Sequence, residues 1–109
     1  MEEYEIIMTP DAVEDLWELR NYIADVLLSP ETALEYIRTV REEIAGLAQF
    51  PSRYRPMDEE PWHSRAVRRF PAKNFYVYYR IDEASGRVFI MNVIYAMRNQ
   101  LQALAEKTK

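Results

Sequence analysis

Positive charge gathers in one short stretch of an otherwise acidic chain. The stretch HSRAVRRFPAKNF, from His63 to Phe75, holds four basic residues and no acidic one, whereas the whole chain has a formal net charge of −4. Arginine guanidinium groups donate hydrogen bonds in a planar fork that matches the oxygens of phosphates and carboxylates. The cluster therefore predicts a surface that binds an anionic partner.

Individual basic residues in this region allow more than one interpretation. Arg68, Arg69 and Lys73 alternate between the two faces of the expected sheet, so not all three can serve one site. Charges on an edge strand also protect it from aggregation, which is the alternative role for these three residues. Arg80 is a candidate phosphate ligand, but pairing with a carboxylate of a partner or of its own chain is the favoured interpretation.

Tyr76 and Tyr78 stand between these arginines. Tyrosines can stack on bases or donate a proton, although in strands they more often serve as half-buried packing residues. His63 is the only histidine of the chain, and we interpret it as incidental because it follows Pro61 and Trp62 in an expected loop. No Ser/His/Asp constellation and no metal triad can be assembled, so we expect neither a metal nor another cofactor.

Composition narrows the class of protein. The chain has 109 residues, which fits one domain, and we treat residues 1–109 as a single unit. It contains no cysteine and only two glycines, which excludes a disulfide framework and argues against a glycine-rich phosphate loop. The N-terminus lacks the pattern of a signal peptide, and no apolar run reaches the length of a membrane span. We therefore expect a small cytoplasmic domain without a membrane association.

The net charge hides a division between the two halves of the chain. Residues 1–61 hold 15 acidic and 5 basic residues, whereas residues 62–109 hold 3 acidic and 9 basic ones, giving net charges of −10 and +6. Such asymmetry favours a polyanionic partner for the basic half, while plain solvation of two surfaces is the alternative.

Hydrophobic periodicity predicts an α+β fold. We expect a strand at 4–8, helices at 10–28 and 30–47, a proline-rich loop at 50–61, strands at 64–70, 74–82 and 87–95, and a short C-terminal helix at 98–107. Two helices joined by almost no linker must fold back on each other. The result is a helical hairpin packed on one face of a mostly antiparallel four-stranded sheet, in the order β-α-α-β-β-β.

The apolar spacing also predicts which residues meet in the core. The helices present one apolar stripe and the strands alternate, so Phe75, Val77, Tyr79 and Ile81 should share one face of the sheet. The residues expected to pack between the hairpin and the sheet are Leu16, Ile23, Ile37, Ile44, Leu47, Val77, Ile90 and Ile94.

Three fragments, taken in order, resemble the RelE/ParE superfamily of toxins from type II toxin–antitoxin systems of the plasmid stabilisation type. They are IMTPDAVEDLWELRNYI at 7–23, LAQFPSRYRP at 47–56, and RRFPAKNFYVYYRIDEASGRVFIMNVIYAMRNQ at 68–100. The resemblance covers nearly the whole chain. It implies the fold described above and a small toxin that is neutralised by an antitoxin protein.

The resemblance also implies roles for particular residues. RelE-like members cut mRNA in the ribosome without metal, which requires cations around the phosphate, and Arg98 matches the family's arginine after the last strand. Arg69, Lys73 and Tyr95 stand near further catalytic places of such mRNA interferases. The residues that would bind RNA or antitoxin are Arg68, Arg80, Tyr76 and Tyr78.

Three functions are consistent with this resemblance. The first is RelE-like, ribosome-dependent cleavage of mRNA without metal. The second is ParE-like inhibition of DNA gyrase, which is favoured by the acidic bulk and by Tyr76 at a place where RelE-like nucleases carry a catalytic arginine. The third is a degenerate, non-toxic module that only binds an antitoxin. Fold alone does not choose between them.

Overall fold

The computed structural model describes residues 3–27, 30–72 and 75–95. In chain order, its elements are β1 (Glu5–Met8), α1 (Pro10–Leu27), α2 (Pro30–Ala45), two 3-10 turns (Gly46–Ala48 and Pro51–Arg53), β2 (Arg68–Ala72), β3 (Phe75–Asp82) and β4 (Arg87–Tyr95). The predicted C-terminal helix lies outside the described residues. The remaining order agrees with the one predicted from periodicity.

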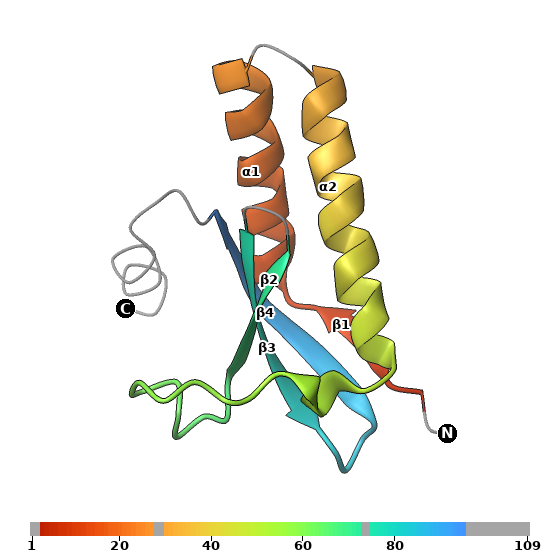
Figure 1. Ribbon diagram of the computed structural model, residues 1–109, viewed down its shortest axis with the longest axis vertical. Helices are drawn as coiled ribbons and strands as arrows, with labels where there is room; N and C mark the ends of the chain where they lie inside the picture. Colours follow the sequence, from red (N-terminus) through yellow and green to blue (C-terminus); the bar gives the residue numbers. More distant parts are fainter. Residues whose placement is uncertain (1–2, 28–29, 73–74, 96–109) are drawn as a thin grey trace.

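The four strands form one sheet in the order β1-β4-β3-β2. β1 pairs in parallel with β4, and the other two pairings are antiparallel, so the predicted mostly antiparallel sheet is confirmed. The two helices run side by side as a hairpin, and α1 packs along β4 (Figure 1). Eight of the nine acidic residues in these two helices are exposed.

One strand of the prediction begins too early. We expected a strand over 64–70, but residues 61–66 form turns and β2 starts at Arg68. The Glu60 carboxylate accepts hydrogen bonds from the backbone N–H of Ser64 at 2.8 Å and from its hydroxyl at 2.5 Å. Because such local side-chain bonds compete with strand pairing, residues 61–66 form turns here instead of a strand.

The predicted core is confirmed except at Ile37 and Ile94. Leu16, Ile23, Ile44, Leu47, Val77 and Ile90 are all buried in one cluster between the hairpin and the sheet. Ile37 packs against this cluster but is only partly buried. The assignment of Ile94 to this face was wrong, because Ile94 lies in a second buried cluster with Met57, Val67 and Tyr78.

A β-bulge explains the misplaced residue. Tyr79 pairs with Ile90, yet the preceding Tyr78 pairs with Asn92, so Met91 is an extra residue in β4. An inserted residue reverses the alternation of side chains beyond it. Val93 therefore joins the helix-side core, whereas Ile94 turns to the opposite face of the sheet.

Two side chains of the hairpin's N-terminal end hold α1 to this bulge. Thr9 caps α1, accepting the N–H of Ala12 at 3.2 Å, while its own hydroxyl donates to the Ile90 carbonyl at 2.7 Å. Asp15 is 3% exposed and accepts two hydrogen bonds, from the backbone N–H of Val93 at 2.9 Å and from the side-chain amide of Asn92 at 3.2 Å. The helix is therefore fixed to the sheet at the point where β4 is irregular.

Asp15→Ala should lower the free energy of unfolding by about 2–4 kcal/mol, because two donors lose their acceptor and each unsatisfied buried group costs about 1–3 kcal/mol. The matched control is Glu14→Ala, one residue earlier on the exposed side of α1, which should change stability by no more than about 0.5 kcal/mol. Urea denaturation measures both. Equal stability of the two variants would contradict the role given to Asp15.

Tyr79 is a second buried polar anchor, between the sheet and the loop after α2. It is fully buried, and its hydroxyl donates to the Pro51 carbonyl at 2.5 Å. Burial raises the pKa of this hydroxyl to about 12, above its ordinary value of 10.0. The folded state therefore holds the proton through a range of pH in which the unfolded chain releases it.

The pH dependence of stability should report this difference. Below pH 10 the contribution of Tyr79 is fully present, and it is lost as pH rises from 10 towards about 12. Tyr79→Phe should be less stable than wild type by about 1 kcal/mol below pH 10, because one hydrogen bond is lost. Denaturation curves should show that this difference in the free energy of unfolding between wild type and Tyr79→Phe narrows at higher pH. A gap that stays constant up to pH 12 would contradict this assignment.

Candidate partner-binding face

The face of the sheet opposite the helices is the candidate site, and we call it the open face. Residues 57–67 fold over part of it, where Met57, Val67, Tyr78 and Ile94 are buried together. Trp62, Tyr76 and Met91 pack against them and remain partly accessible. The open face is therefore a packed, largely apolar surface.

Arg69 and the two tyrosines lie together on the open face. The Arg69 guanidinium carbon lies 4.6 Å from the centre of the Tyr76 ring. Burial raises the pKa of the Tyr78 hydroxyl, and the neighbouring Arg69 guanidinium partly opposes that shift. At neutral pH the Tyr78 hydroxyl keeps its proton and can donate a hydrogen bond.

Arg68 points elsewhere, as the strand alternation predicted. Its guanidinium donates to the backbone carbonyls of Tyr54 at 2.5 Å and Ser52 at 3.5 Å, tying β2 to the loop after α2. Arg80 lies over a different ring from Arg69, with its guanidinium carbon 5.1 Å from the centre of the Phe89 ring. The predicted pairing of Arg80 with a carboxylate of its own chain is not among the salt bridges of the described residues.

Other predicted site residues are described only in part or not at all. Lys73 and Arg98 lie outside the described residues, so their roles stay predictions. Tyr95 ends β4, where its backbone pairs with Phe75, and its proposed catalytic role also stays a prediction. His63 holds one ring nitrogen, Nδ1, 2.9 Å from the Met57 carbonyl oxygen, which fits a local role within the loop.

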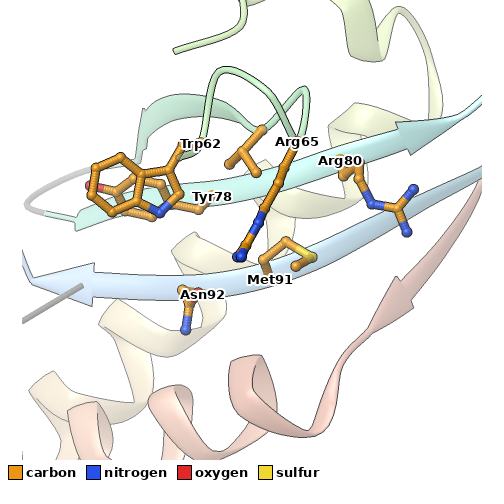
Figure 2. Close-up of a pocket in the computed structure, with 7 residues that line it drawn as sticks. Trp62, Arg65, Tyr78, Arg80, Met91 and Asn92 are labelled. Carbon is orange, nitrogen blue, oxygen red and sulfur yellow. The ribbon is translucent and has the colours of Figure 1, made fainter. Parts of the chain in front are cut away.

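Sequence reasoning missed a pocket on the open face. It has a volume of about 330 Å³ and lies between the loop and strands β3 and β4 (Figure 2). The available signal was Trp62, which directly precedes the basic stretch at 63–75 and places an aromatic ring next to arginines. The lining residues are Trp62, Arg65, Val67, Tyr78, Arg80, Met91 and Asn92.

Neither a metal centre nor a membrane span is found where the structure can be described. In residues 3–27, 30–72 and 75–95, no three histidine, aspartate or glutamate side chains gather closely enough to hold a metal ion. None of the helices in these ranges has the length and apolar character needed to cross a bilayer.

The sequence was compared with models of protein families. Residues 6–100 match the family described as the ParE toxin of the type II toxin–antitoxin system parDE. The chain belongs to this family. The match extends from β1 past the end of β4, so the helical hairpin and the open face are both parts of the toxin domain. None of the curated proteins matches the chain significantly.

Solved structures of proteins from toxin–antitoxin systems share the fold. The chain resembles a protein of the chromosomal ParDE toxin–antitoxin system of P. aeruginosa, with a TM-score of 0.70 and 21% identity over 85% of this chain and 96% of that one. It also resembles a protein of the RelBE2 complex of Mycobacterium tuberculosis, with a TM-score of 0.62 and 22% identity over 87% and 93%. A free-state mutant of the E. coli toxin RelE gives 0.60 and 11% identity, over 97% of both chains.

The two neighbouring arginines of this toxin should behave differently when truncated. Arg68→Ala should lower the free energy of unfolding by about 1–3 kcal/mol, because charge-assisted bonds to backbone carbonyls are lost. Arg69→Ala, at the exposed next position, should change it by about 0.5 kcal/mol or less. Chemical denaturation measures both variants, and the reverse ranking would contradict the division of roles.

Proposed function

We propose that this chain is a ParE-like toxin that arrests growth by binding DNA gyrase, and that a cognate antitoxin neutralises it by covering the open face. The observation that carries the proposal is the match to ParE toxins over residues 6–100. The solved ParDE and RelBE2 proteins belong to toxin–antitoxin pairs, which supports a protein antitoxin as the first partner.

The geometry of the described arginines supports a binding toxin over a nuclease. Metal-free cleavage of RNA needs cations that converge on one phosphate. Here Arg68 is bound to loop carbonyls, Arg69 stacks on Tyr76, and Arg80 lies over Phe89. Arg68 is thus held by its own loop, and Arg69 and Arg80 each lie over a different ring, an arrangement that favours contacts with an extended protein surface.

RelE-like cleavage of mRNA is the second candidate. It is favoured by the cluster in which Arg69 lies beside Tyr76 and Tyr78, since a cation and a phenol are groups that phosphodiester cleavage uses. Arg98, Lys73 and Tyr95 would complete that site, and their roles remain predictions. A module that binds antitoxin without toxicity is the third outcome of the same experiment.

Induced expression in a bacterial host should arrest growth and raise the DNA-damage response while mRNA stays uncut within codons. Co-expression of a cognate antitoxin, to be sought among small reading frames beside the toxin gene, should restore growth and yield a complex that co-purifies at moderate salt. Transcript cleavage would support the second candidate, and unaffected growth the third. Either result would overturn gyrase inhibition.

Arg98 provides a variant for the same assay. We expect it to contact the target, so Arg98→Ala should relieve growth arrest with little change in melting temperature, while Arg98→Lys restores part of the effect because a point charge lacks the guanidinium fork. Full toxicity of Arg98→Ala at equal expression would contradict this role.

A further inference from the structure

The pocket beneath Trp62 combines an apolar interior with a cationic rim. Tyr78 and Val67 are buried residues of its lining, and the partly buried Met91 and Trp62 line it beside them. Figure 2 shows the Trp62 indole over Tyr78 and the Arg65 side chain reaching from the loop towards Met91. A volume of about 330 Å³ has room for one large side chain.

The Trp62 indole N–H and the Arg65 and Arg80 guanidinium groups are the polar groups of this pocket that a ligand could engage. The indole N–H of Trp62 is shielded from solvent and has no hydrogen-bond acceptor in that part of the chain. Arg65 and Arg80 both line the pocket, and neither takes part in the salt bridges formed there. The pocket therefore offers a donor and two cations to a ligand that brings acceptors and negative charge.

We propose that this pocket is an anchor site for the antitoxin, receiving one large apolar side chain, preferably aromatic, from a segment with carboxylates beside that residue. The inference rests on the proposed neutralisation by an antitoxin and adds the chemistry that the site selects. An aromatic anchor packs against the rings of Trp62 and Tyr78 and the thioether of Met91. The adjacent carboxylates reach the guanidinium groups of Arg65 and Arg80.

The pocket suits a side chain better than a nucleobase. A base is recognised through hydrogen bonds to its edge as well as by stacking. Asn92 is the amide in the lining, and it already donates to Asp15. The remaining interior is mostly aromatic and aliphatic, so it favours an apolar anchor. In protein interfaces a few residues contribute most of the affinity, and a buried anchor surrounded by charged contacts is such an arrangement.

Tryptophan fluorescence can test the pocket directly. The chain has two tryptophans, so Trp17→Phe leaves Trp62 as the reporter. The probe is acetyl-Asp-Phe-Asp-amide, which should give a saturable change in emission at millimolar concentration. Two control peptides, acetyl-Asn-Phe-Asn-amide without charge and acetyl-Asp-Ala-Asp-amide without the anchor, should each bind at least about tenfold more weakly.

Variants of the full chain then connect the pocket to the antitoxin. Arg65→Ala combined with Arg80→Ala should weaken the binding of the peptide and of the purified antitoxin by at least about tenfold. Arg38→Ala, at an exposed position on α2, is the matched control and should leave both affinities unchanged. Trp62→Phe keeps an aromatic ring at this position but removes the indole N–H. Calorimetry should show that the antitoxin binds this variant more weakly than wild type.

Several results would overturn the inference. These are equal binding of the three peptides, saturable binding of adenosine monophosphate in place of the acidic aromatic peptide, and self-association that buries Trp62 without any peptide. An antitoxin that binds the double arginine variant as tightly as wild type, and still rescues growth, would also overturn it while leaving the proposed function intact.

Discussion

The buried carboxylate of Asp15 and the hydroxyl of Thr9 hold α1 to the bulge of β4, and the arrangement of both faces of the sheet depends on this attachment. The bulge inserts Met91, which sends Val93 to the helix side and Ile94 to the open face. An irregular strand leaves backbone groups that need partners, and Asp15 supplies one to Val93. Asp15 therefore stabilises the bulge in β4, and the bulge in turn places Ile94 in the second cluster.

The two faces that result have different roles. The helix side is a continuous apolar core, closed by the hairpin, whose outer surface is acidic. The open face carries the smaller cluster, the pocket beneath Trp62 and the cations of Arg65, Arg69 and Arg80. In the proposed function, the division of charge directs an acidic partner to the open face, while the acidic hairpin repels it.

Periodicity alone was sufficient to predict the element order, the helical hairpin and most of the core, because apolar spacing is a local property. It failed at Ile94, since the bulge depends on a contact with Asp15 that lies 78 residues from Val93. It also placed the start of β2 too early, where Glu60 captures Ser64. Arg68 and Arg69 look alike in the sequence, and only the fold shows that one is bound to loop carbonyls while the other remains on the surface. The pocket could not be predicted from the sequence, because the loop and the two strands that line it are brought together only by the fold.

The proposed action of this toxin, binding to gyrase through a protein-recognition surface, is tested most directly with purified components. Negative supercoiling of relaxed plasmid by gyrase and ATP should be inhibited when the toxin is added, and prior addition of the antitoxin should restore it. A parallel reaction with translating ribosomes should leave the mRNA intact. Normal supercoiling in the presence of excess toxin, together with mRNA cut at the ribosome, would contradict the account.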